Sequence, residues 1–302
     1  MAVGDNFSAP GIGAQQGARG QADEGVAPEA LPTHHRLQQE AVAAAASKLQ
    51  VQRQRGLEVG KGLGNQGDAV RWGEAMGASV RDMGSFQGHG AVAWPAATHL
   101  SWPTVTEGGF HVNRSGKRFS NENSGYSEQA LHVHRQPEKF AWAIWDQRGE
   151  TIAYRQESHV KAVESGCVKR CDSIADIARV TGCDLAALEA TFAEVAACAA
   201  GSKADEFGRD FTRKPMLSAP YFVCRIVGAL THTQGGLEID TGMRVLRTDG
   251  TPFPNLFAGG GAARGLSGPA DWGYMSGSGL LMATSTGRLA GEAAARLVLG
   301  RS

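Results

Sequence analysis

The segment between residues 231 and 297 contains the residue types and spacing best suited to holding a ligand. A short apolar run at residues 255–258 leads into three consecutive glycines, where the backbone can approach a ligand closely. The apolar spacing from Leu280 to Leu297 then predicts a largely buried helix of about five turns. The start of such a helix presents free N–H groups and the positive end of a dipole. We therefore expect a binding site for an anion or a cofactor.

Short strands and helices are expected to hold the residues of this binding site in place. Residues 237–239 and 243–246 have the composition of strands, and residues 247–250 have that of a turn after the second strand. Further elements are predicted upstream: a helix at 68–76, a strand at 78–83, a hairpin at 107–119, a strand at 141–144, and helices that begin near Ser173 and Asp184. The binding site is thus expected to belong to a folded protein of mixed helix and sheet.

Composition excludes several classes of protein. The 302 residues carry no formal net charge, so nothing in the charge favours binding to nucleic acid or to an anionic membrane. No run of about 18 apolar residues and no N-terminal export signal occurs, which predicts a soluble cytoplasmic protein without a membrane span. Five cysteines lack paired spacing and are expected to be reduced thiols. Cys167 and Cys171 could share a helix face, but no matching ligands lie near them, so no metal site is expected.

The first 63 residues differ in composition from the rest. Residues 1–32 are rich in Gly, Ala, Gln and Pro, which favours disorder. The glycines of residues 11–17 have no buried strand before them, so they do not predict a dinucleotide-binding turn. Thr33 is a plausible N-cap for a marginal helix over residues 34–55. We expect residues 1–63 to be an atypical, disordered or helical segment.

Five stretches of the sequence resemble one family of flavoproteins. Three lie near the C-terminus, where the sequence reads THTQGGLEID, then MRVLRTDGTPFPNLFAGGGAARG, and then GSGLLMATSTGRLAG. Two more lie upstream: GNQGDAVRWGEAMGASVRDMGSFQGH at residues 64–89 and EGGFHVNRSGKRFSNE at residues 107–122. In this order they resemble the FAD-dependent fumarate reductase/succinate dehydrogenase flavoprotein family, which includes the 3-ketosteroid dehydrogenases. The resemblance covers most of residues 64–297.

The resemblance implies a fold and a division into domains. The expected class is α/β with an α+β cap: a Rossmann-like FAD-binding domain formed by residues 64–88 and 231–302, with a capping domain inserted at residues 89–230. The family's glycine turn for the ADP half of FAD needs about 30 residues of strand, turn and helix. Residues 1–63 contain no convincing buried strand, so the Rossmann-like domain is expected to be incomplete. A complementing N-terminal segment is then needed for tight FAD binding.

The same resemblance implies which residues contact FAD. The Gly-Asp pair that opens a helix in the family's flavin-binding region is matched by Gly67 and Asp68. Asp68 could instead only cap its helix. The start of the last helix would stabilise negative charge on the N1–C2=O edge of the flavin. The remaining matched positions are Thr231, Gly260, Gly261, Gly279 and Leu280. Gly261 stands where the family usually has an acidic residue for the ribityl chain.

Six residues match positions that carry catalysis in the family. Two substrate histidines are matched by His89 and His232, although a lone histidine is often structural. A Thr-Glu pair on the substrate and proton route is matched by Thr106 and Glu107, and Glu107 could equally be a solvated charge. Tyr126 stands at the place of the proton-donor arginine. Tyr274 stands at the place of a second substrate arginine.

The tyrosines change the expected substrate. Arginine offers carboxylates a permanent, forked cation, whereas a phenol offers a neutral donor and a potential base. The 3-ketosteroid dehydrogenases carry a tyrosine at the place of Tyr126 and another near Tyr274, the latter in a register that differs by one. Both side chains could instead serve packing. We expect a neutral or mono-anionic enone, or its saturated ketone, rather than a dicarboxylate.

Three functions remain open from the sequence. The first is an FAD-dependent oxidoreductase that moves a hydride between flavin N5 and a C–C bond next to a carbonyl. The second is a truncated, non-catalytic relative that lacks the ADP-binding half of the FAD site. The third is a structural or interaction protein, which would need an exposed apolar surface. Nothing in the sequence identifies an electron partner.

Overall fold

The computed structural model describes residues 67–270 and 272–300. The predictions for residues 1–63 lie outside these ranges. The predicted helix at 68–76 is confirmed as α2, Asp68–Ala75, which begins after the left-handed Gly67. Val80–Arg81 follows as β1, a shorter strand than the predicted 78–83, because Ala78 makes only an isolated bridge to Arg247.

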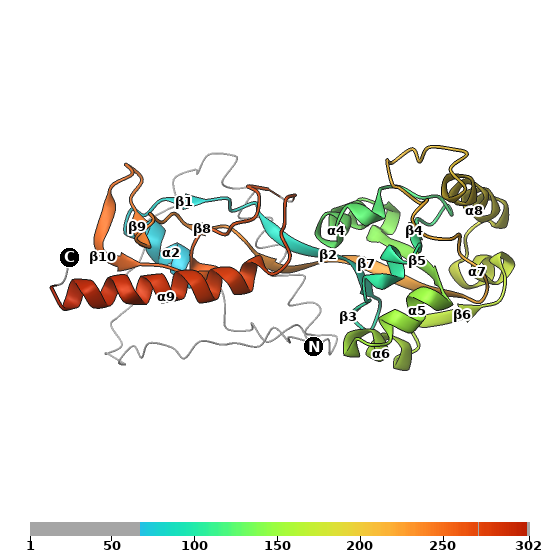
Figure 1. Cartoon of the computed structure of the whole chain (residues 1–302), viewed down its shortest axis with the longest axis horizontal. Coiled ribbons are helices and arrows are strands. Elements are labelled where there is room, and N and C mark those ends of the chain that lie inside the picture. Colours follow the sequence, from blue (N-terminus) through green and yellow to red (C-terminus); the bar gives the residue numbers. More distant parts are fainter. Residues whose placement is uncertain (1–66, 271, 301–302) are drawn as a thin grey trace, which may run out of the picture. The chain divides into compact units, whose positions relative to one another are not determined.

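A six-stranded antiparallel sheet forms the centre of the part of the chain between residues 86 and 233, which we call the sheet half. Its longest strands, β2 (Phe86–Ala93) and β7 (Tyr221–Thr233), pair along their length (Figure 1). The other strands are β3 (Thr98–His99), β4 (Phe110–Val112), β5 (Phe140–Asp146) and β6 (Val168–Cys171). The order is β3-β2-β7-β5-β4, and β6 also pairs with β7. Strand β5 pairs with one edge of β7. Strands β2 and β6 pair with different parts of its other edge.

Helices surround this sheet, and their first residues explain where they start. Ser173 accepts a hydrogen bond from the Asp176 amide, and Asp184 accepts one from the Ala187 amide, so the two predicted helix starts are confirmed. The helices are α3 (Pro103–Thr106), α4 (Tyr126–His134), α5 (Gln147–Ala153), α6 (Glu157–Glu164), α7 (Ile174–Thr181) and α8 (Leu185–Ala199), with short 3₁₀ turns η1 (Glu122–Ser124) and η2 (Pro137–Lys139). Two apolar clusters result, one around Ile177 and Leu188 and one around Trp145.

The predicted hairpin at 107–119 is only half right. The turn forms, because the Asn113 amide donates to the Lys117 carbonyl and the Gly116 amide to the Asn113 carbonyl. The second arm makes no strand, because Arg118 turns inward and pairs with two buried carboxylates, Glu122 and Asp205. Arg209 also pairs with Glu122, at 3.0 Å. This group of four buried charges ties the loop after β4 to the loop at residues 200–212.

The rest of the described chain, residues 67–85 and 234–300, contains smaller elements, and we call it the helix half. Its strands are β8 (Gly236–Leu237), β9 (Arg244–Leu246) and β10 (Pro252–Phe257), and β10 leads through η3 (Gly260–Ala262) towards α9 (Ser278–Val298). β1 pairs with β8 and β9 with β10, both antiparallel. A parallel contact occurs at the bridge between Leu237 and Ala263. The cluster between these elements is small, with five buried apolar residues around Val245.

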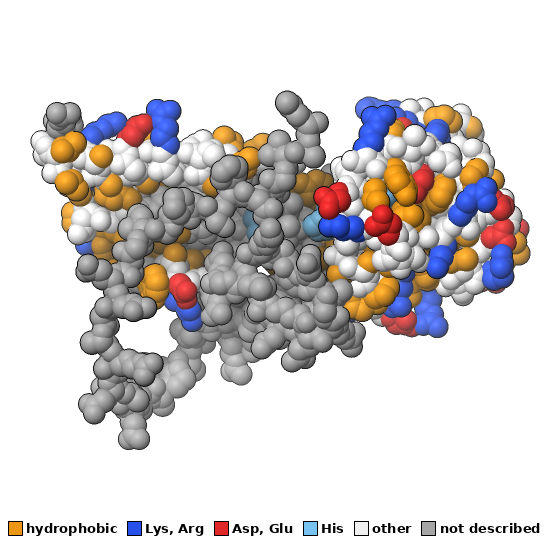
Figure 2. Space-filling view, turned by 90° about the horizontal axis from the view of Figure 1, so that it is seen from below, with side chains coloured by type: hydrophobic (Ala, Val, Ile, Leu, Met, Phe, Trp, Pro, Cys, Tyr) orange, Lys and Arg blue, Asp and Glu red, His pale blue; other side chains and the backbone are white. Residues whose placement is uncertain are grey.

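The start of α9 is confirmed, but its predicted burial is wrong. Three of its residues, Ser278, Met282 and Thr286, are buried. Leu281 is 50% exposed and Leu289 43% exposed, although both belong to the predicted apolar set. The reason is geometric: α9 touches η3 and β10 along one narrow face, and its apolar set is wider than that face. Hydrophobic side chains accordingly reach the surface of this half, at the left of Figure 2.

Candidate functional site

Tyr126 lies at the centre of a group of ring side chains. It is the first residue of α4, and its Oη donates a hydrogen bond to Ser276 Oγ at 3.2 Å. Its ring centroid lies 5.8 Å from that of Tyr274 and 5.3 Å from that of His89. Trp102, which precedes α3, packs edge-on against Tyr126 at 5.9 Å. The phenol thus has an aromatic wall on one side and a hydroxyl acceptor on the other.

His89 is neutral in this site, and the position of its proton follows from its neighbours. Its Nδ1 accepts a hydrogen bond from the Ala91 amide at 3.3 Å, so the neutral ring carries its hydrogen on Nε2. Burial lowers its pKa to about 3, with help from the charges of His99 and His111. His99 stacks on the same ring at 4.5 Å. His89 therefore offers an N–H donor, and no charge, at ordinary pH.

His232 extends the group from β7. Its ring lies 6.1 Å from Tyr274, and its Nε2 lies 2.5 Å from Gln234 Nε2. A β-carbon on Gly279 would come within 3.3 Å of the same Nε2, so the start of α9 approaches this histidine closely. Successive ring contacts therefore join His89, Tyr126, Tyr274 and His232, which are four of the six residues expected to carry catalysis. We call these four side chains the ring cluster.

The start of α9 presents donors beside the ring cluster. Gly277, with φ of 83°, precedes the helix and gives it no side-chain cap. In the described part of the chain the amides of Gly279 and Leu280 have no acceptor. Nearby, Gly260 has φ of 55°, and a β-carbon there would lie 3.3 Å from Ala283 Cα, whereas one on Gly261 would meet nothing within 4 Å. Uncapped amides beside glycine backbone fit the polar edge of a flat cofactor such as a flavin.

Other expected FAD residues lie apart from the ring cluster. Gly67 precedes α2, and Asp68 makes an ion pair with Arg71. Asp68 does not cap its helix, which sets aside that alternative. Thr231 is an exposed residue of β7, one position before His232.

Thr106 and Glu107 also lie outside the ring cluster. Thr106 ends α3, and Glu107 pairs with Lys214 through a 2.7 Å contact between Oε2 and Nζ. The two residues are linked to the cluster only through the helix that Trp102 begins. Glu107 is thus an ion-paired charge in this structure.

Several residues of the site carry no signal that the sequence alone could reveal. Trp102 reaches the ring cluster from the segment between β3 and α3, and His99 reaches it from β3, far along the chain from Tyr274. Ser276 had a weak signal, since it lies two residues after a predicted catalytic tyrosine within a glycine-rich loop. Only the folded chain brings it to Tyr126.

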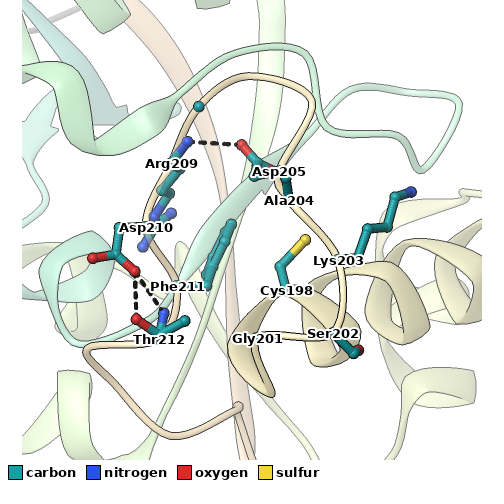
Figure 3. Close-up of a pocket in the computed structure, with 11 residues that line it drawn as sticks. Cys198, Gly201, Ser202, Lys203, Ala204, Asp205, Arg209, Asp210, Phe211 and Thr212 are labelled. Carbon is teal, nitrogen blue, oxygen red and sulfur yellow. Dashed lines mark hydrogen bonds between the residues drawn. The ribbon is translucent and has the colours of Figure 1, made fainter.

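A separate cavity lies in the loop after α8. It has a volume of about 450 Å³ and is lined by Cys198, Asp205, Arg209 and Phe211, among others (Figure 3). Asp205 accepts a hydrogen bond from the Arg209 amide at 3.0 Å, which closes the loop on itself. Burial raises the pKa of the Cys198 thiol, so it is a poor nucleophile. None of the expected site residues lines this cavity.

The sequence matches one family model over most of its length. Residues 34–280 match the family described as FAD binding domain. Among the described residues no helix is both long enough and apolar enough to cross a membrane.

Similar proteins include reductases and dehydrogenases. The chain is 28% identical, over 78% of its length and 39% of the relative's, to a Shewanella frigidimarina protein named Probable fumarate reductase Ifc3. It is 28% identical to a 4-oxocyclohex-2-ene-1-carboxylate 5-dehydrogenase of Sinomonas cyclohexanicum, over 63% of the chain and 36% of the relative. A solved 3-ketosteroid Δ1-dehydrogenase of Sterolibacterium denitrificans matches with a TM-score of 0.59 and 25% identity, over 77% of this chain and 47% of that one. The chain spans about two-fifths of the length of the curated relatives it matches first.

Proposed function

The chain belongs to the FAD binding domain family, and from that premise we propose that it is an FAD-dependent oxidoreductase acting on a C–C bond next to a carbonyl. The observation that carries the proposal is the hydrogen bond from Tyr126 Oη to Ser276 Oγ, made within the ring cluster. It joins a proton-bearing phenol to the loop that leads into α9. Bound FAD supplies a two-electron acceptor or donor for hydride.

The chain's own residues would handle the proton and the carbonyl. In the reduction direction Tyr126 can give its Oη proton to a substrate carbon, and in the oxidation direction the phenolate takes a proton from that carbon; the bond to Ser276 orients the phenol. The neutral His89 can donate from Nε2 to a carbonyl oxygen and so polarise it. Trp102 and Tyr274 cover Tyr126 on two sides and limit access of water to its phenol.

We propose a substrate that is a neutral or mono-anionic enone, or its saturated ketone. Tyr126 and Tyr274 stand at the places where the family resemblance puts two substrate arginines, so neither position supplies a permanent cation. Two carboxylates would therefore be desolvated there without cations to offset the cost. Two relatives support this substrate class: the Sinomonas enzyme is named for an oxocyclohexene monocarboxylate, and the Sterolibacterium structure holds 1,4-androstadiene-3,17-dione.

The role of Tyr126 is tested by Tyr126→Phe in protein saturated with FAD. Loss of the phenolic proton should lower the rate with an enone by about 10²-fold and leave the flavin spectrum unchanged. Tyr154→Phe is a matched control, because Tyr154 is 48% exposed and lies outside the ring cluster. A rate for Tyr126→Phe equal to that of the control would return Tyr126 to a packing role.

We propose that residues 64–88 and 231–302 form the FAD-binding domain and residues 89–230 the capping domain. We also propose that tight FAD binding needs an apolar segment over α9, supplied by a separate chain or by a longer form of this protein. The exposed Leu281 and Leu289 support that need.

In the alternative, the chain is a non-catalytic relative without the ADP-binding half of the site. Isothermal titration of the chain with FAD tests both ideas, and weak or absent binding is expected. Tight stoichiometric binding by the chain alone would contradict the need for an added segment and also the non-catalytic alternative.

A further inference from the structure

Two hydrogen bonds from α4 bracket Tyr274. Tyr126, the first residue of α4, donates to Ser276, which lies two residues after Tyr274. Glu128, on the same first turn, accepts at Oε1 from the Gly273 amide at 3.2 Å, one residue before Tyr274. One helical turn thus holds the backbone on either side of the second tyrosine of the ring cluster.

The carboxylate of Glu128 also lies close to the backbone of Gly125. A β-carbon on Gly125 would lie 2.2 Å from Glu128 Oε2. No basic side chain pairs with Glu128 among the described residues. Its defined partner outside α4 is the Gly273 amide.

The loop around Tyr274 needs such a restraint. Gly273 has φ of 84°, a backbone conformation open mainly to glycine, and Gly268 donates to its carbonyl over a long 3.4 Å contact. Trp272 and Met275, on either side, are 59% and 53% exposed and provide little packing. The bonds to α4 therefore help to fix the backbone on either side of Tyr274.

We propose that Glu128 is a positioning residue for Tyr274. Its carboxylate oxygen holds the Gly273 amide so that the Tyr274 ring stays 5.8 Å from the Tyr126 ring. Glu128 acts through a backbone bond and touches neither substrate nor cofactor. The catalytic part of this role rests on the proposed function, whereas the positioning part does not.

The test compares Glu128→Ala with Glu128→Gln. Both remove the negative charge from the first turn of α4, but glutamine keeps an acceptor oxygen for the Gly273 amide. Hydrogen exchange of that amide should become about tenfold faster in Glu128→Ala and stay near wild type in Glu128→Gln. With FAD and an enone, kcat should fall about tenfold in Glu128→Ala with a smaller change in KM, and glutamine should rescue it.

Each readout has its own contradicting result. Unchanged exchange in Glu128→Ala, or equal acceleration in both variants, would overturn the positioning role. Accelerated exchange with unchanged kcat would overturn its importance for catalysis. If the wild type does not turn over an enone, the proposed function fails, yet the exchange comparison still decides whether Glu128 fixes the loop.

Discussion

The sheet half and the helix half of this chain are stabilised in different ways. In the sheet half, two clusters of buried apolar side chains lie around the strands, and four buried charges pair with one another. In the helix half, one small cluster holds two short strand pairs, and the long α9 leaves several leucines exposed. The ring cluster draws side chains from both halves. The sheet half should therefore owe its stability to its own core, whereas the helix half has a small core and exposed apolar side chains on α9.

Among the variants that test this difference, the one that removes Glu122 should change the free energy of unfolding most. Glu122→Ala leaves Arg118 and Arg209 in the interior without their shared carboxylate, which should cost about 3–5 kcal/mol of the free energy of unfolding. Urea titration followed by tryptophan fluorescence measures this cost. Glu292→Ala, which breaks an exposed pair with Arg288, should leave the free energy of unfolding close to that of the wild type. Similar costs for the two variants would mean that the buried charges do not hold the sheet half together.

Leucine truncations in the two halves should give the next largest difference. Leu188 is fully buried in the sheet half, so Leu188→Ala should cost about 2–5 kcal/mol. Leu289, at 43% exposure on α9, should cost no more than about 0.5 kcal/mol in Leu289→Ala. The same urea titration serves for both. A large cost at Leu289 would show that α9 is already covered in solution and would remove the reason for a covering segment.

Acid should weaken the sheet half through His111, the smallest of the three effects. Burial lowers the pKa of His111 from 6.5 to about 4, so between these values the unfolded chain binds more protons than the folded one. The free energy of unfolding should fall as the pH drops through this window, by up to about 1.4 kcal/mol per pH unit for this histidine. His89, with its pKa lowered to about 3, acts in the same direction.

The matched variant for this effect is His111→Leu, which removes the titrating ring. Its free energy of unfolding should depend less on pH than that of the wild type over the same window, whatever its value at neutral pH. Glu122 acts in the same direction below its unfolded pKa of 4.5: burial alone would raise its pKa, but Arg118 and Arg209 lower it to about 2, so the slopes are compared above about pH 5. An unchanged slope in His111→Leu would assign the acid sensitivity to other groups.

The sequence predicted local structure better than burial. Helix starts at Ser173 and Asp184 could be predicted because a capping side chain acts on amides three residues away. The burial of α9 was wrong, because spacing reports which side chains could be covered and not whether anything covers them. The hairpin at 107–119 failed because Arg118 finds its partners Glu122 and Asp205 inside, and Asp205 lies far along the chain.

The candidate site, too, was only partly predictable from the sequence. Resemblance suggested Tyr126, Tyr274, His89 and His232, and ring contacts join these four. Their individual roles stay predictions. Trp102, His99 and Ser276 join the cluster through tertiary contacts between distant segments, which no local pattern encodes.

Flavin reoxidation tests the proposed activity most directly. Protein with saturating FAD is reduced without oxygen, and the visible absorbance of the flavin is followed after addition of cyclohexenone or of fumarate. We predict rapid return of the oxidised flavin with cyclohexenone, little with fumarate, and a rate about 10²-fold lower with the enone in Tyr126→Phe. Faster reoxidation by fumarate than by the enone would contradict the account, because Tyr126 and Tyr274 stand at the places where arginines would receive two carboxylates.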